Sequence, residues 1–317
     1  MVEPLATVFV TGASGFVGRS VVARLLERGC RVRALVRPGS EERLAPAGAA
    51  AAWADRLDIR PGDIRNAPLL IEAMRGSGAV IHLVGILRPK GENTFAAVHL
   101  HGTENVIRAC RAAGIRRLLH MSALGAGRAI GTPYFVTKEK AEEAVRRSGL
   151  DWTIFRPSVI HGPRGDFMIQ VARMVSRPLP VPLVGAGRQV LQPVYVEDVA
   201  ELFARAIGLP ESVSRTYEVG GPEVLSLRKF LATVARVLRG KSKWMVPVPV
   251  FLVRFGAWLD ERLTADPPIT RDELKMLLAA RPCNIRPMEV DFDLKPARLE
   301  DALAAYAAEL KTAAGLR

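Results

Sequence analysis

Tyr134 and Lys138 form the residue pair in this chain that is best suited to proton transfer. Both fall on a predicted helix, and their four-residue spacing places the two side chains on one face. An ammonium group close to a phenol favours the phenolate and is expected to lower the phenol's pKa. Such a tyrosine can exchange a proton with a hydroxyl while a hydride moves to or from a nicotinamide. The same spacing also occurs on ordinary amphipathic helices, so the context of the pair decides between the two interpretations.

Ser122 supplies part of that context, because it ends a strand predicted over 117–122, ahead of the helix. Doubly wound folds bind their ligands at the carboxyl ends of parallel strands. Ser122, Tyr134 and Lys138 are therefore expected to meet at that edge of the sheet. Ser122 is a candidate partner for a substrate carbonyl.

A glycine-rich segment near the N-terminus predicts where a cofactor would bind. Residues 8–18 read Val-Phe-Val-Thr-Gly-Ala-Ser-Gly-Phe-Val-Gly, an apolar strand followed by three evenly spaced glycines. The first glycine permits a tight turn, the second lets a pyrophosphate approach the backbone, and the third lets the next helix pack closely on the sheet. That helix would direct its first N–H groups at the phosphates. The less favoured alternative is a glycine-rich turn that binds no ligand. The predicted cofactor contacts in this segment are Gly12, Ser14, Gly15, Phe16, Val17 and Gly18.

The end of the second predicted strand, 32–36, indicates which dinucleotide is preferred. NAD-binding sites place an acidic residue here to hold the ribose hydroxyls. In this chain Arg37 follows the strand, and no acid occurs before Glu41. A guanidinium can bind a 2′-phosphate through paired hydrogen bonds, whereas a carboxylate would repel it. We therefore predict NADP(H) over NAD(H); the alternative is that Arg37 stacks on the adenine and discriminates little.

Strand and helix patterns alternate through the first half of the chain, as is typical of a parallel sheet with helices on both faces. Further strands are predicted at 57–59, 79–84, 152–155 and 216–219, and a helix at 134–147. The expected fold is α/β, a Rossmann-type doubly wound parallel sheet with a smaller C-terminal substrate lobe. The dinucleotide-binding domain is placed at 1–165 with a return segment at 190–222, and the lobe mainly at 166–317. Beyond residue 219 the chain is predicted to be helical with turns, and 38–54 is predicted to be a loop with a short helix.

Eight short motifs resemble those of the extended or atypical short-chain dehydrogenases/reductases, the NAD-dependent epimerase/dehydratase family. In chain order they are 11–18, 62–63, 82–85, 102–105, 121–122, Tyr134-x-x-x-Lys138, 155–158 and 193–198. Within the family, 120–125, 149–157 and 192–198 are similar to bacterial relatives of the nucleotide-binding accessory subunit of respiratory complex I.

The resemblance also implies how a bound dinucleotide would lie. Lys138 would hold the nicotinamide ribose as well as tune the tyrosine. Asp63 and Ile64 would line the adenine. Val84 and Gly85 would border the ribose, and Pro157 and Val159 would lie near the nicotinamide.

Three positions depart from the family pattern. Ala123 and Leu124 follow Ser122 where a further hydroxyl is usual, so the hydroxyl that polarises a carbonyl is Ser122 or is absent. His99 stands where an asparagine is common. His161 replaces an aromatic residue, and a partly exposed loop histidine is favoured there over a substrate contact.

Composition argues against several classes of protein. With 49% hydrophobic and 24% charged residues, the chain suits a folded globular protein. Its net charge of +13 comes from scattered arginines rather than a basic run, so nucleic-acid binding is not expected. Cysteine and histidine spacings predict neither a disulfide framework nor a metal site. The pattern lacks a signal peptide and a membrane span, so a cytoplasmic location is expected.

The segment 244–263 stands apart from these motifs, because its apolar residues recur at helical spacing. In a basic chain this pattern suits a peripheral membrane helix. A lid or packing helix of the lobe is favoured instead, since Pro247, Pro249 and Gly256 should limit a long helix. The residues that would share one face are Phe251, Phe255, Trp258 or Leu259, and Leu263.

Two functions follow from the sequence. The first is an NADP(H)-binding oxidoreductase or epimerase that acts on a small molecule of unknown class, with Tyr134 as acid or base. The second is a nucleotide-binding structural or assembly protein attached to a respiratory complex, peripheral to the inner membrane face. The intact tyrosine–lysine pair favours the first function, and the resemblance to the complex I branch favours the second. The sequence leaves the oligomeric state undetermined.

Overall fold

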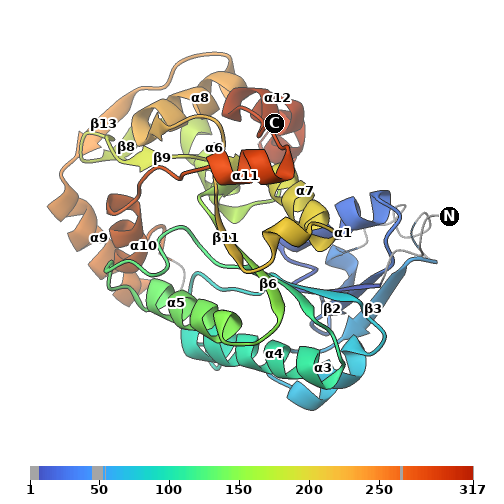
Figure 1. Ribbon diagram of the computed structural model, residues 1–317. Coiled ribbons are helices and arrows are strands. Elements are labelled where there is room, and N and C mark those ends of the chain that lie inside the picture. Colours follow the sequence, from blue (N-terminus) through green and yellow to red (C-terminus); the bar gives the residue numbers. More distant parts are fainter. Residues whose placement is uncertain (1–6, 45–52, 54, 265–266, 317) are drawn as a thin grey trace.

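A seven-stranded parallel sheet forms the centre of the computed structural model, which describes residues 7–44, 53, 55–264 and 267–316 (Figure 1). The strand order is β11-β6-β5-β4-β1-β2-β3, and it reverses between β1 and β4, where Thr11 pairs with His82. Such a reversal is where a doubly wound sheet binds its ligand. The predicted Rossmann-type fold is confirmed. The strands are β1 Val8–Thr11, β2 Val32–Val36, β3 Leu57–Pro61, β4 Ala79–His82, β5 Arg117–Met121, β6 Asp151–Pro157 and β11 Arg215–Val219.

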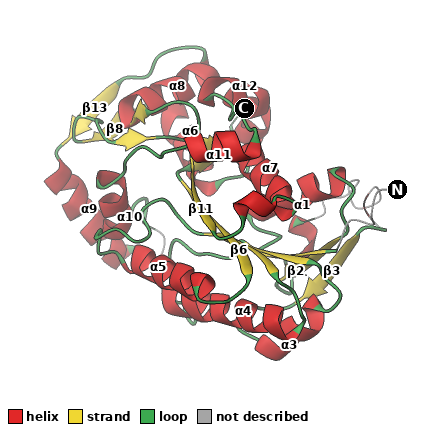
Figure 2. Cartoon of the chain, in the orientation of Figure 1, coloured by secondary structure: helices red, strands yellow, loops and turns green. Residues whose placement is uncertain are grey.

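Helices cover both faces of this sheet (Figure 2). Alternate residues of β1 point to opposite faces, so Val8 and Val10 join one apolar core while Phe9 joins the other. The first core holds α1 Phe16–Glu27, α7 Val196–Ile207 and α11 Arg286–Phe292. The second holds α3 Ala67–Met74, α4 Gly102–Ala112 and α5 Pro133–Arg146, with the π-helical η2 Ala96–His101 leading into α4.

A further core lies outside the sheet and joins α6 Asp166–Ser176, α8 Leu227–Arg239 and α12 Leu299–Ala313 through buried residues such as Val171, Phe230 and Leu303. The expectation of helices and turns alone beyond residue 219 is wrong at 225–226 and 245–248, which form strands. These strands belong to two of three small two-stranded sheets that accompany this core. Their strands are short and pair with segments distant in sequence, which local patterns do not reveal. They are β8 Val181–Val184 with β13 Met245–Val248, β9 Val190–Leu191 with β12 Leu225–Ser226, and β7 Ile160–His161 with β10 Val194–Tyr195.

Two segments connect these parts. Residues 190–222 bring the chain back to the sheet, because α7 packs on α1 and β11 pairs with β6. After β13, α9 Val250–Leu263 and α10 Arg271–Leu278 lie at the opposite end of the molecule from β3 (Figure 1). The remaining elements are the short helices η1 Glu41–Arg43 and η3 Pro210–Ser212. The loop predicted at 38–54 lies partly outside the described residues, at 45–52 and 54. Within the described part of the chain, every helix is too short or too polar to cross a membrane.

Candidate functional site

The glycine turn after β1 requires glycine for steric reasons. Gly12 has a φ of +73°, which a side chain rarely allows, and a Cβ there would lie 3.1 Å from the backbone nitrogen of Val84. A Cβ on Gly18 would lie 2.1 Å from the carbonyl oxygen of Gly12. Gly15 caps α1 without a side-chain hydrogen bond, so the first N–H groups of the helix are not occupied by a cap. The turn therefore offers an anion-binding helix start beside the β1–β4 reversal.

The other predicted contacts in this turn differ in their placement. Ser14 is partly exposed, whereas the Val17 side chain is buried in the core beneath α1. The ring of Phe16 packs against the turn after β7, where a Cβ on Gly162 or Gly165 would lie within 3.1 Å of it. Val17 therefore has only its backbone to offer to a ligand.

Lys138 connects three elements at the carboxyl edge of the sheet. Its Nζ donates a hydrogen bond to the carbonyl oxygen of Met121 at 3.1 Å, and a Cβ on Gly85 would lie 3.0 Å from the same nitrogen. The residue is 2% exposed. Burial lowers the pKa of Lys138 to about 8, although the negative charge of Glu142 opposes the shift. The ammonium is thus held beside the predicted ribose-binding loop.

Tyr134 lies one helical turn before Lys138, at the start of α5. Its ring meets the rings of His99 and Phe95 edge-on, with centroids 5.4 and 6.0 Å away. Burial raises the pKa of Tyr134 to about 12. The expected lowering by the ammonium is therefore wrong for this structure, because the desolvation of the phenolate dominates. Tyr134 keeps its proton at neutral pH.

His99 holds a fixed orientation against the tyrosine. Its Nε2 accepts a hydrogen bond from the backbone N–H of Ile86 at 3.0 Å, so the proton resides on Nδ1, which bonds to Oγ1 of Thr137 at 2.9 Å. Burial, aided by the charge of Lys138, lowers the pKa of His99 to about 3. The sequence singled out this position only as a departure from the family pattern.

Two more buried histidines lie under the site, and the sequence reasoning missed both. His82 bonds to Oγ1 of Thr11 at 2.7 Å and to Oγ1 of Thr103 at 3.0 Å. His120, on the neighbouring strand, has its ring centroid 5.3 Å from that of His82. Burial lowers the pKa of His82 to about 3 and that of His120 well below its ordinary value. Their positions at the ends of two adjacent strands were the available signal.

Glu142 was also missed, although it lies one turn beyond Lys138 on α5. It is fully buried and accepts hydrogen bonds from Arg156 at 2.6 and 2.8 Å and from Arg146 at 2.5 Å. Burial acts to raise the pKa of Glu142, but Arg156, the neighbouring Ser122 hydroxyl and Arg146 outweigh it and lower the pKa. Ser122 is also buried, and its hydroxyl lies near enough to this carboxylate to affect the pKa of Glu142.

The predicted adenine side gathers positive charge. Asp63 accepts hydrogen bonds from the backbone and guanidinium of Arg65 at 2.8 and 3.0 Å. Burial acts to raise the pKa of Asp63, but the hydrogen bonds from Arg65 and the charge of exposed Arg37 outweigh it and lower the pKa. Ile64 is buried beneath Gly102, where a Cβ would lie 2.4 Å from it.

Further arginines approach the glycine turn from other elements. Burial lowers the pKa of Arg19 on α1, and the positive charges of Arg164 and Arg43 lower it further. The charges of Arg164 and Arg43 thus act on Arg19, and the acids Glu309 and Asp166 oppose them in part. The sequence did not identify this cluster, because its members come from segments far apart in the chain.

The predicted nicotinamide side is formed where β6 ends. The carbonyl of Pro157 accepts from the N–H of Leu124 at 2.9 Å, and that of Val159 accepts from the N–H of Val194 at 3.0 Å. These bonds fix the strand end beside β5 and β10. The side chain of Val159 is partly buried.

His161 follows in β7 and is fully buried, so the expectation of a partly exposed loop histidine is wrong. Its Nδ1 is hydrogen-bonded to the hydroxyl of Tyr306 at 2.9 Å, and its ring stacks on Tyr195 with centroids 5.6 Å apart. Burial lowers the pKa of His161 to about 4. A residue 145 positions later covers it, which no local pattern indicates.

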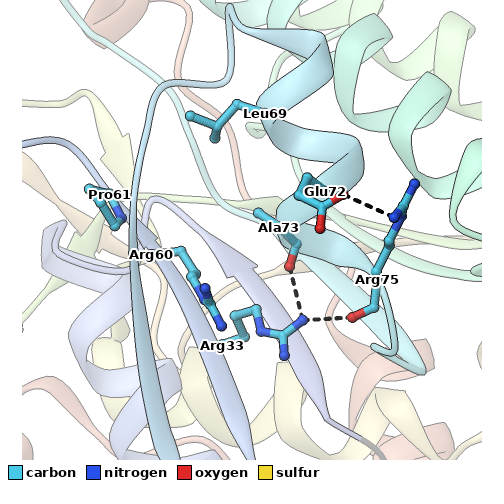
Figure 3. A pocket seen from close by; sticks show the side chains of 7 residues that line it. All are labelled: Arg33, Arg60, Pro61, Leu69, Glu72, Ala73 and Arg75. Atoms are coloured by element: carbon cyan, nitrogen blue, oxygen red, sulfur yellow. Dashed lines mark hydrogen bonds and ion pairs between the residues drawn. The ribbon is translucent and has the colours of Figure 1, made fainter.

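A separate hollow of about 590 Å³ lies between β2, β3 and α3 (Figure 3). Arg33 lines it, and its guanidinium donates to the carbonyls of Ala73 at 3.0 Å and Arg75 at 2.7 Å. Arg75 in turn pairs with Glu72 at 3.1 Å. None of the predicted site residues lines this hollow, so we regard it as distinct from the candidate site. Across the described residues, no group of three or more histidine, cysteine or acidic side chains is arranged to hold a metal ion.

Comparison with known proteins identifies the family. Residues 8–220 match the model of the NAD dependent epimerase/dehydratase family, and the chain belongs to this family. It is 28% identical over 243 residues to the ceramide reductase of Caulobacter vibrioides, covering 76% of this chain and 71% of that protein. It is 27% identical over 271 residues to the mitochondrial NADH-ubiquinone oxidoreductase 40 kDa subunit of Neurospora crassa, and the match covers 85% of this chain and 69% of that subunit.

A solved structure supports the fold independently. The dTDP-glucose 4,6-dehydratase DesIV from Streptomyces venezuelae, determined with NAD and TYD bound, matches with a TM-score of 0.74 at 22% identity over 98% of each chain. Family and fold together support the prediction of an NAD(P)-dependent oxidoreductase or epimerase.

Proposed function

We propose that this protein is an NADP(H)-dependent oxidoreductase in which Tyr134 transfers the proton, an epimerase being the related alternative. One observation carries the proposal: the Lys138 ammonium is buried between Gly85 and the Met121 carbonyl, one turn from Tyr134. Burying an ammonium costs free energy, so a pocket that retains one suggests a use for its charge. The group lies next to the strand reversal, where this fold binds dinucleotides.

The residues around the glycine turn fit a dinucleotide. Gly12 and Gly15 leave the start of α1 open to a pyrophosphate, and a Cβ at either would narrow that space. Asp63 and Ile64 would line the adenine, and Val84 and Gly85 the ribose. When bound, the nicotinamide would supply or accept a hydride.

The preference for NADP(H) rests on the surplus of cations at the adenine end. Arg37 lies near the Asp63 carboxylate, and Arg65 already neutralises that carboxylate through hydrogen bonds. The charge of Arg43, which follows β2, acts on Arg19 of α1 and helps to lower the pKa of Arg19. A 2′-phosphate would relieve this repulsion and accept paired hydrogen bonds from Arg37.

The pKa values favour the direction of carbonyl reduction. With a pKa of about 12, Tyr134 is protonated at neutral pH and is suited to donate to a carbonyl oxygen that gains charge. Lys138, with a pKa of about 8, would stabilise the phenolate that remains. Ser122 is the candidate hydroxyl to polarise the carbonyl. Pro157 and Val159 would border the nicotinamide.

The first experiment is a fluorescence titration with NADPH and NADH, followed by NADPH oxidation against lipid carbonyls, quinones and nucleotide sugars. We expect tighter NADPH binding and turnover with one of these classes. Lipid carbonyls come first, because one relative is named a ceramide reductase. Failure to bind either dinucleotide would refute the proposal.

A second function is a non-catalytic, nucleotide-binding subunit or assembly protein of a respiratory complex. The similarity to the 40 kDa NADH-ubiquinone oxidoreductase subunit favours it. This function predicts tight dinucleotide binding without turnover, and co-purification with a membrane complex. A purified chain that turns over NADPH by itself would count against it.

A further inference from the structure

Helix α9 carries its apolar residues on the side that faces solvent. Phe251, Phe255 and Leu259 recur every four residues and are 69%, 59% and 40% exposed. Ala257, on the opposite face, is the one residue that α9 buries. A helix of a folded domain ordinarily turns its apolar stripe to the core. We call this exposed side the α9 apolar face: Phe251, Leu252, Phe255, Leu259 and Leu263. It is exposed rather than packed on the lobe, and the role of the helix as a lid or packing helix stays a prediction.

The helix begins only at Val250, so Pro247 and Pro249 limit it as predicted, whereas Gly256 does not. Pro249 is its N-cap and Pro247 lies in β13, where neither interrupts the helix. Gly256 is accommodated within it. The α9 apolar face consequently extends over the whole helix as one continuous strip.

Positive charge accompanies this strip. Arg254 and Arg262 are exposed, and the Arg262 guanidinium lies 4.1 Å from the ring centre of Trp258. The acids of α9 are placed differently: Glu261 bonds to the backbone and guanidinium of Arg271 at 2.7 Å, and Asp260 lies on the side away from Phe255. Arg254 thus lies at one side of the strip, and Arg262, seven residues after Phe255, lies within the strip at its C-terminal end.

The strand that leads into α9 adds a second apolar and basic group. Trp244 is 75% exposed, and Leu179 is 68% exposed. The carbonyl of Trp244 accepts a hydrogen bond from the N–H of Val181, which brings Trp244 close to the segment that holds Leu179. Lys243 lies beside Trp244 and near enough to Arg239 for their charges to interact. β13 and α9 lie at the same end of the molecule (Figure 1).

We propose that the α9 apolar face and Trp244 dock on the surface of an anionic lipid bilayer. An interfacial helix combines an apolar face, aromatic side chains and flanking cations in this way. Anionic headgroups would neutralise Arg254 and Arg262, and the net charge of +13 would attract the whole molecule to them. A second copy on the same face would instead bring these arginines against like charges.

Sedimentation with vesicles tests the proposal on the whole protein. The chain should bind vesicles of phosphatidylcholine and phosphatidylglycerol in equal parts far better than phosphatidylcholine alone. Some binding should survive about 0.5 M salt, because salt does not screen apolar insertion. Brominated lipid should quench tryptophan fluorescence, since Trp244 and Trp258 would enter the interface.

Phe255→Glu should weaken the partition coefficient at least about tenfold, because it puts a charge on the inserted face. Val290→Glu is the matched control, since it introduces the same charge at an apolar residue of α11 that is 68% exposed. Both variants should bind NADPH like the parent, which separates this test from that of the proposed function. Equal vesicle binding by Phe255→Glu and the parent, or binding abolished by salt alone, would overturn the proposal. A dimer that Phe255→Glu dissociates, without vesicle binding, would overturn it in favour of a second copy.

Discussion

Glu142 lies one helical turn beyond Lys138 on α5, and its carboxylate opposes the burial that lowers the pKa of Lys138 to about 8. The same carboxylate is held by Arg156, which comes from the end of β6. The charge state of Lys138 therefore depends on a residue that is outside the predicted site. This relationship makes Glu142 a candidate positioning residue.

Glu142→Gln should lower the pKa of Lys138, because it removes the negative charge that favours the ammonium. If turnover needs that ammonium, activity falls as pH rises through about 8, and the variant should lose activity at lower pH than the parent. Breaking the buried ion pair should also reduce the free energy of unfolding by about 3 kcal/mol. Glu143→Gln, at the more exposed neighbour, is the control. An unchanged pH profile in Glu142→Gln would separate Glu142 from the chemistry.

Gly18→Ala and Gly15→Val should fail in different ways. A Cβ on Gly18 meets a backbone oxygen at 2.1 Å, so we expect a loss of about 1–3 kcal/mol in the free energy of unfolding. Gly15 is exposed and meets its nearest backbone oxygen at 3.1 Å, so Gly15→Val should fold yet lose NADPH binding. Thermal unfolding and NADPH titration distinguish the two effects. Normal affinity in folded Gly15→Val would remove the turn from the site.

Arg37→Glu should weaken NADPH binding much more than NADH binding. Losing a charge-assisted pair and adding repulsion should shift the preference by about 2 kcal/mol or more. Arg31→Glu makes the same charge change at an exposed position just before β2 and should leave the preference intact. The measurement is the ratio of the two dissociation constants. Equal losses for both dinucleotides would show that Arg37 does not contact a 2′-phosphate.

The buried histidines should make the protein sensitive to acid. The unfolded chain protonates His82 near pH 6.5, but the folded protein does so only near pH 3, so stability falls as pH drops between these values. Each such histidine contributes a slope of about 1.4 kcal/mol per pH unit. Burial lowers the pKa of His120 well below its ordinary value, so His120→Leu should reduce the slope by about this amount in a comparison of unfolding free energies from pH 6.5 downward. An identical slope in His120→Leu would show that His120 is protonated in the folded state.

Much of the fold was accessible from sequence because its signals are local. The glycine turn at 11–18, the alternating strands and the helix around Tyr134 all depend on neighbouring residues. The placement of Lys138 beside Gly85 follows from the parallel sheet, whose strand ends share one edge.

The features that sequence reasoning missed depend on distant contacts or on burial. His161 is covered by Tyr306, and β13 pairs with β8 some sixty residues earlier. The pKa of Tyr134 depends on how far the ring is desolvated, which residue spacing does not report. Glu142 offered a usable signal, since it continues the four-residue spacing of Tyr134 and Lys138.

The most direct test of the account is NADPH oxidation by Tyr134→Phe beside the parent and a matched Tyr195→Phe control. Removing the hydroxyl should leave NADPH affinity nearly unchanged and lower turnover roughly 100-fold or more, the scale of a lost general acid. Tyr195→Phe should keep most of the parent rate. Turnover by Tyr134→Phe at the parent rate would contradict the central claim that Tyr134 transfers the proton.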